Sequence, residues 1–181
     1  MIVKNNDNRI WSDKKSAFTL IETIIYISIL SLTIVGFVSF VMSVSNARNK
    51  NSAVVEVQAN ARQALEIISQ KIRSASDVNL ASSSFGVDPG VLNLVMKSPA
   101  KNPTIIKLDK DNGTLTISEG TGNAVALISN KIYISNLIFS YYTGTGRKKN
   151  IGVNATFNYY NPSGGKDFEY SQTLRSSISL R

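Results

Sequence analysis

Residues 18–44 read FTLIETIIYISILSLTIVGFVSFVMSV and decide how the rest of the chain is organised. This stretch contains a single charged side chain, that of Glu22. Because a helix needs about 20 apolar residues to cross the hydrocarbon core of a membrane, the stretch is long enough to span it once. A buried core helix is the alternative, but such helices rarely run this far without a charge. The sequence therefore predicts a single membrane span followed by one domain.

Composition excludes several classes of protein before any motif is considered. Of the 181 residues, 43% are hydrophobic and 18% are charged, and the formal net charge is +8. These values exclude a disordered or collagen-like chain. Cysteine and histidine are both absent from the sequence, which excludes disulfides, thiol nucleophiles, histidine bases and the usual zinc sites. No paired carboxylates or catalytic triad emerge, so we expect no enzyme activity and no cofactor.

The flanks of the apolar stretch suggest how it is oriented. Four basic residues precede it, Lys4, Arg9, Lys14 and Lys15, and two follow it closely, Arg48 and Lys50. Basic residues next to the start of a span favour a cytoplasmic N-terminus, and long C-terminal domains cross the membrane largely regardless of their charge. We therefore expect residues 45–181 to lie outside the cytoplasmic membrane.

The segment KKSAFTLIE, Lys14 to Glu22, marks the start of the apolar stretch. An ordinary secretory signal has an apolar core of about 7–15 residues and then a small-residue cleavage site. Here the core is longer, and the small residue Ala17 precedes it. The segment resembles the leader junction of type IV prepilins and type II secretion pseudopilins, in which a basic leader and a small residue precede FTLIE. Ala17 stands where these families nearly always have Gly.

The resemblance implies a processing pathway and a set of partners. Residues 1–17 would be a leader peptide, cut between Ala17 and Phe18 by a prepilin peptidase that also methylates the new Phe18 amine. Other major and minor pilins or pseudopilins would be partners, first in the membrane and then in a pilus or pseudopilus. A carboxylate inside a membrane is costly unless it is paired. In these families the glutamate at the position of Glu22 is thought to pair with a neighbouring subunit's amine during assembly, and a tolerated interfacial acid is the alternative.

After residue 44 the apolar side chains follow one helix face. They are Val54, Val57, Ala61, Ala64, Leu65, Ile68, Ile72 and Ala75. This spacing is typical of an amphipathic helix. We predict one helix from Phe18 to about Ser76, with a transmembrane part over 18–44 and an amphipathic part over 45–76. Gly36 is a point at which the first part can bend or unwind.

Short strand-like runs occupy residues 77–181, the predicted head. They cover residues 91–96, 104–108, 114–118, 124–128, 132–142, 151–160 and 168–180, separated by Asn, Gly, Pro and Lys. Such runs predict antiparallel sheets packed on the helix stripe. The expected fold class is therefore α+β with a pilin-like layout. The stretches ARQALEIISQKIRSAS and TLRSSISLR resemble the J-type minor pseudopilins and W-type minor pilins, which implies a structural subunit of a tip or priming complex.

Each of two loops in the head has a purely structural interpretation and a functional one. In DKDNG, Asp109 to Gly113, the Asn-Gly pair predicts a hairpin turn, while Asp109 and Asp111 are the acids that a calcium loop would use. In GTGRKKN the basic side chains are those of Arg147, Lys148 and Lys149. A solvated hairpin tip accounts for them, and contact with the phosphates of nucleic acid is the alternative.

Two other functions stay open on the sequence alone. One is a DNA-uptake or adhesive minor pilin whose head binds a ligand. The other is a membrane-anchored β-domain with no filament role, including a domain released by an ordinary signal peptidase after Ala47.

Overall fold

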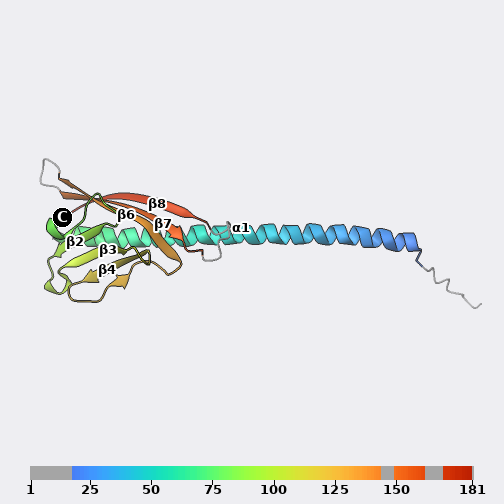
Figure 1. Ribbon diagram of the computed structural model, residues 1–181, viewed down its shortest axis with the longest axis horizontal. Helices are drawn as coiled ribbons and strands as arrows, with labels where there is room; N and C mark the ends of the chain where they lie inside the picture. The colour runs from blue at the N-terminus through green and yellow to red at the C-terminus, as the bar shows by residue number, and fades with distance from the viewer. Residues whose placement is uncertain (1–17, 144–148, 162–168, 181) are drawn as a thin grey trace, which may run out of the picture. The chain divides into compact units, whose positions relative to one another are not determined.

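The computed structural model describes residues 18–143, 149–161 and 169–180. These residues form one long N-terminal helix followed by antiparallel sheets, which is the predicted α+β class (Figure 1). The chain divides into two compact units between Val44 and Ser45. The helix α1, Leu20–Ser74, contributes to both units.

The first unit consists of the apolar part of α1, which is continuous through Gly36. Its large Leu, Ile, Val and Phe side chains are exposed on every face. Serine and threonine hydroxyls within it donate to the carbonyl four residues earlier, as Ser28 does to Ile24 at 2.7 Å and Thr33 does to Ile29 at 2.9 Å. These hydroxyls therefore need no partner from water. The segment is long and apolar enough to cross a membrane.

The second unit begins with the amphipathic part of α1 and contains two sheets. In the first sheet the strands follow one another in the order β1 (Ala75–Val78), β2 (Val91–Met96), β3 (Thr104–Asp109), β4 (Thr114–Glu119) and β5 (Val125–Ala126). In the second sheet the order is β6 (Ile132–Thr143), β7 (Lys149–Tyr159) and β8 (Ser171–Ser179). All neighbouring strands are antiparallel. Two short 3₁₀ helices, η1 (Leu80–Ser82) and η2 (Pro99–Lys101), lie in the connections of the first sheet.

The end of α1 differs from the prediction. The helix ends at Ser74, and the next four residues form β1, which pairs with β2. Lys71 and Arg73 in the last turn suit the negative end of the helix dipole, and the Ser74 hydroxyl donates to the Lys71 carbonyl at 3.0 Å. The helix thus ends two residues before the predicted end at about Ser76. The strand β1 was not predicted, because four residues carry too little periodicity to separate a strand from a helix end.

One hydrophobic core joins the helix to both sheets. The helix contributes a buried stripe made of Ala53, Val57, Ala61, Ala64, Ile68 and Ile72. Leu92, Leu94, Ile106 and Leu115 come from the first sheet, and Leu137, Phe139, Ile151 and Phe157 come from the second. Full burial of one large apolar side chain stabilises a fold by about 1.5–3 kcal/mol. Of the predicted stripe, Val54 and Leu65 are only partly buried.

Polar contacts fix the helix against the strands that cover it. Lys71 of α1 forms an ion pair with Glu119 of β4. The Asn60 side-chain oxygen accepts the Ser129 N–H at 2.9 Å, just before β6 begins. Both contacts join residues that are far apart in the sequence, so they form only once the sheets have packed on α1.

Candidate functional site

The FTLIE segment forms the beginning of α1. Phe18 and Thr19 precede the first helical residue, Leu20. The Thr19 hydroxyl oxygen accepts the N–H of Glu22 at 3.3 Å, and the Thr19 carbonyl accepts the N–H of Thr23 at 3.2 Å. Thr at the cap with Glu three residues later is the sequence of a capping box. Part of the motif therefore has a local role, which is to start the helix.

Glu22 contacts an aromatic side chain at the helix start. The Tyr26 hydroxyl donates to Glu22 Oε1 at 2.9 Å. The rings of Phe18 and Tyr26 meet edge to face with centroids 6.3 Å apart. Tyr26 was not among the predicted site residues, although its spacing from Glu22 and Phe18 by one and two helical turns is visible in the sequence.

The two proposed cleavage positions have different settings. Ala17 lies outside the described residues, whereas Phe18 is described and 73% exposed. Residues 45–47, the alternative signal-peptidase site, lie inside α1 with their backbone in helical hydrogen bonds. Proteolysis is concentrated in exposed loops and termini. The helical setting of residues 45–47 therefore argues against cleavage there.

Of the three basic loop residues, Arg147 and Lys148 lie outside the described residues. Lys149 is the first residue of β7, and its ammonium group lies 2.5 Å from an oxygen of Asp77 in β1. This pairing raises the pKa of Lys149. It also lowers the pKa of Asp77, as does, to a smaller extent, the Val78 N–H that the same carboxylate accepts at 2.7 Å. Lys149 therefore links the two sheets, and its charge is already partly balanced.

The predicted hairpin turn is present between β3 and β4, with Gly113 at φ +62°. The Asp109 carboxylate accepts the Asn112 side-chain N–H at 2.8 Å and the Asp111 N–H at 3.3 Å. These bonds, above all the one from Asn112, lower the pKa of Asp109. Within the described ranges, no three acidic side chains gather as metal ligands. The geometry therefore gives Asp109 a role in the turn and adds no third ligand to the calcium interpretation.

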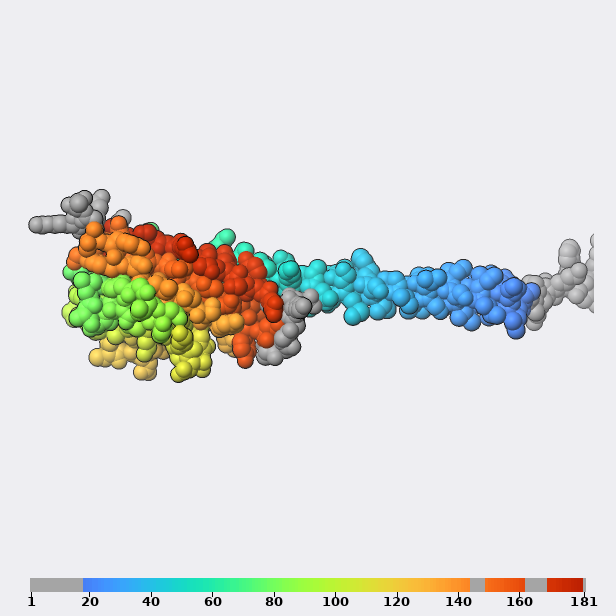
Figure 2. All heavy atoms as spheres, turned by 45° about the horizontal axis from the view of Figure 1, so that its top comes forward, coloured from blue at the N-terminus to red at the C-terminus, as the bar shows by residue number. Residues whose placement is uncertain are grey.

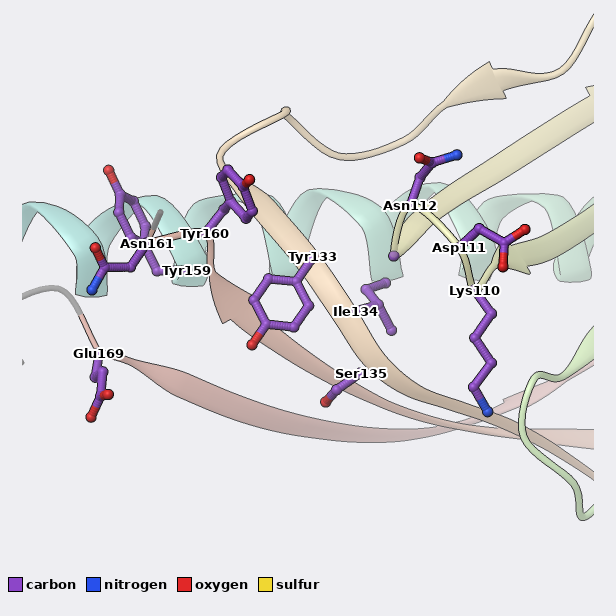
Figure 3. A pocket seen from close by; sticks show the side chains of 11 residues that line it. Lys110, Asp111, Asn112, Tyr133, Ile134, Ser135, Tyr159, Tyr160, Asn161 and Glu169 are labelled. Carbon is purple, nitrogen blue, oxygen red and sulfur yellow. The ribbon is translucent and has the colours of Figure 1, made fainter. Parts of the chain in front are cut away.

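A pocket of about 590 Å³ opens where this turn meets the second sheet (Figure 3). It is lined by the turn residues 110–113, by residues 133–135 of β6, and by Tyr159, Tyr160, Asn161 and Glu169. We call it the tyrosine pocket. Figure 3 shows Tyr133 between the turn on one side and Tyr160 and Asn161 on the other. Its aromatic rings, amides and charges of both signs suit binding of a polar ligand.

Gly113 makes the close approach of the turn to β6 feasible. Its carbonyl accepts the Ile134 N–H at 2.8 Å, and an added Cβ would lie 2.9 Å from the Cβ of Tyr133. Any side chain here would push the turn off β6, and its positive φ is also best suited to glycine. The tyrosine pocket was not predicted, since the pairing of Ile132 with Tyr159 that brings the tyrosines together is a tertiary feature.

Comparisons with models of protein families, with curated proteins and with solved structures found no match to this chain. Its function is therefore inferred from the residues and the geometry described above.

Proposed function

We propose that the chain is a minor pilin or pseudopilin, a structural subunit of the tip or priming complex of a type IV pilus or type II secretion pseudopilus. The observation that carries the proposal is the apolar part of α1. It presents large apolar side chains on every face and holds a single acid, Glu22, in its capped first turn. Such a surface is unstable in water, because each of these side chains gains about 1.5–3 kcal/mol on burial.

Two environments can bury this surface, and a pilin uses both in turn. Lipid surrounds the segment in the membrane, and the helices of other subunits surround it in the filament. The amphipathic part of α1 is already covered by the sheets of its own head. The apolar part is therefore the portion of the helix left for partners.

The charges at the helix start fit the processing that the sequence motif implies. Cleavage between Ala17 and Phe18 would place a new amine two residues before the first helical residue. A cation is unfavourable at the positive end of a helix dipole, and an acid in the first turn offsets it. A carboxylate deep in the membrane costs about 2.5–3.5 kcal/mol. In the filament the Phe18 amine of a neighbouring subunit would offset the cost of Glu22.

The proposal includes a location and an order of events. The N-terminus is cytoplasmic, residues 45–181 lie outside the cytoplasmic membrane, and prepilin peptidase acts on the leader before assembly. The proposed cut needs a small residue before it, and Ala17 supplies one where Gly is usual.

Intact-mass and N-terminal analysis of the full chain, purified from its native membrane, tests the proposal. We expect a chain that begins with methylated Phe18. Replacing Ala17 with Glu should block processing without affecting membrane insertion, because the apolar stretch is unchanged, and the matched Ala17→Gly variant should be processed at least as well as the wild type. A native chain that begins at Met1 would contradict the proposal. So would an Ala17→Glu variant that has the same size as the processed wild type.

The tyrosine pocket favours a second candidate function, an adhesive minor pilin whose head binds a ligand. This function is compatible with the first, since a tip subunit can both assemble and bind. DNA uptake gains less support, because Lys149 is paired with Asp77.

A further inference from the structure

The head has one long strand edge with no partner in the part of the chain that the structure describes. β8 is the last strand in the order β6-β7-β8. It pairs with β7 over its whole length without any shift in register. In Figure 2 it forms a continuous strip on the surface of the head, drawn in red.

The hydrogen-bond pattern shows which backbone groups of β8 point outward. The Tyr159 N–H donates to the Tyr170 carbonyl at 3.0 Å, and the Leu180 N–H donates to the Lys149 carbonyl at 2.9 Å. In an antiparallel pair, bonded and non-bonded positions alternate. The even-numbered residues of β8 therefore bond to β7, and the odd-numbered ones direct their N–H and C=O groups away from it. The odd-numbered residues, Ser171, Thr173, Arg175, Ser177 and Ser179, are also the exposed ones.

The other sheet edges of the head are protected. β1 has four residues and a register shift, and β5 has two residues. The free side of β6 is covered by the loop before β2, since the N–H groups of Gly86 and Gly90 donate to the Phe139 and Leu137 carbonyls, both at 2.8 Å. Folded proteins shorten, cover or charge their strand edges because open edges recruit other strands. Among the described strands, β8 combines length, regular register and an open edge.

The side chains of β8 indicate what kind of strand would fit. Its outward row is made of small hydroxyl side chains around one central charge, that of Arg175. A second copy of β8, placed antiparallel and centred, would bring Arg175 against its own equivalent, and like charges directly opposite are destabilising. A carboxylate opposite Arg175 would instead stabilise the pair.

We propose that the β8 edge receives an extended strand of a partner protein, with an Asp or Glu opposite Arg175. Main-chain hydrogen bonds would hold the strand, and the central charge would select it. The contact is independent of helix packing through α1, so it goes beyond the proposed assembly function.

The test uses the full chain in detergent micelles and two fluorescent nine-residue peptides that alternate Thr and Val. The peptides differ only at the central residue, which is Glu in one and Lys in the other. From the size of cross-strand charge effects, we expect the Glu peptide to bind about fivefold more tightly by fluorescence anisotropy at low salt. Arg175→Glu should reverse this preference.

A matched pair of variants tests the backbone contribution. Ser177→Pro removes an outward N–H and leaves the bonds to β7, whereas Ser177→Ala keeps the N–H. We expect the proline variant to lose about tenfold or more in affinity and the alanine variant to bind as the wild type does. Circular dichroism establishes whether each variant is folded. If the proline variant does not fold, the Arg175→Glu variant still tests the proposal.

Three results would overturn the proposal. They are failure of both peptides to bind, binding that survives Ser177→Pro in a folded chain, and a dimer of the chain that Ser177→Pro abolishes. The last result would identify a second copy as the occupant of the edge.

Discussion

The local contacts of Glu22 at the start of α1 are compatible with its proposed role in assembly. In the first turn it lies where the helix dipole favours an acid, and its oxygen accepts the Tyr26 hydroxyl. One hydroxyl does not replace the hydration of a carboxylate, so a charged Glu22 in hydrocarbon still favours a cationic partner. This residual need connects a local feature of the helix start to the proposed assembly function.

Changing Glu22 tests that connection. We expect Glu22→Ala to leave cleavage between Ala17 and Phe18 unchanged while less partner pilin is recovered with the chain from detergent extracts. Glu22→Gln should resemble Glu22→Ala, because it keeps an acceptor for Tyr26 and loses the charge. Tyr26→Phe is the matched control, since it removes only the internal hydrogen bond. Normal copurification of Glu22→Ala would mean that assembly depends on apolar packing alone.

Asp88 is the residue that ties the loop before β2 to β6. Its carboxylate accepts the Leu137 N–H at 2.9 Å and the Lys110 ammonium at 3.0 Å. These contacts, foremost the bond from Leu137, lower the pKa of Asp88. A folded-state pKa below the unfolded value of about 3.9 stabilises the fold at higher pH. This stabilisation is lost as the pH falls through the folded-state pKa.

Asp88→Asn should therefore reduce stability in a pH-dependent way. It keeps an acceptor for Leu137 and loses the charge, so we expect the free energy of unfolding to fall by about 1 kcal/mol at pH 7. The difference from the wild type should shrink below about pH 4. Chemical denaturation of the full chain in detergent at several pH values measures it. Asp111→Asn, an exposed change on the neighbouring turn, is the control, and a gap that stays constant down to low pH would assign the effect to something other than the charge.

At the scale of the element, the backbone of α1 is helical throughout, whereas its surroundings differ between its two parts. Its apolar part has no covering side chains within the described chain, while its amphipathic part places one stripe in the core. The buried stripe includes Ala53, Ala61 and Ala64, whose small side chains let strands approach the helix closely. The larger Val57, Ile68 and Ile72 are also completely buried.

Ile68→Ala tests the contribution of this stripe. Ile68 is completely buried, so we expect its truncation to lower the free energy of unfolding by about 2–5 kcal/mol. Val55, on the same helix, is 58% exposed, and Val55→Ala should change it by less than about 0.5 kcal/mol. Denaturant titration followed by circular dichroism compares the two. Similar effects at both positions would show that the stripe is not the main contact between α1 and the sheets.

At the scale of the whole head, the tyrosine pocket exists because the two sheets meet. The turn of the first sheet docks on β6 through the Gly113 carbonyl, and the ends of β6 and β7 bring three tyrosines beside it. The same meeting is reinforced by the ion pair between Asp77 and Lys149. Binding in this pocket would therefore depend on the packing of the head as a unit.

A double variant tests binding in the tyrosine pocket. Tyr133→Ala with Tyr160→Ala removes two of its exposed rings, and we expect retention of the purified chain on an array of polar glycans to fall by about tenfold. Tyr142→Ala is the matched control, because Tyr142 is 56% exposed on β6 but does not line the tyrosine pocket. Equal retention of the wild type and the double variant would contradict ligand binding in the tyrosine pocket.

What the sequence determines about this chain is what local composition encodes. The apolar run after Ala17, the helical spacing up to Ile72 and the Asn112–Gly113 turn are each set by neighbours along the chain. They predicted α1 and the hairpin, and the short strand-like runs after residue 90 predicted the strands β2–β8. Tertiary structure decided what depends on distant residues, such as the ion pair between Asp77 and Lys149, which are 72 residues apart. It also decided the strand β1, the tyrosine pocket and the open edge of β8, because strand pairing and burial are settled only when separate segments compete for the same core and the same backbone hydrogen bonds.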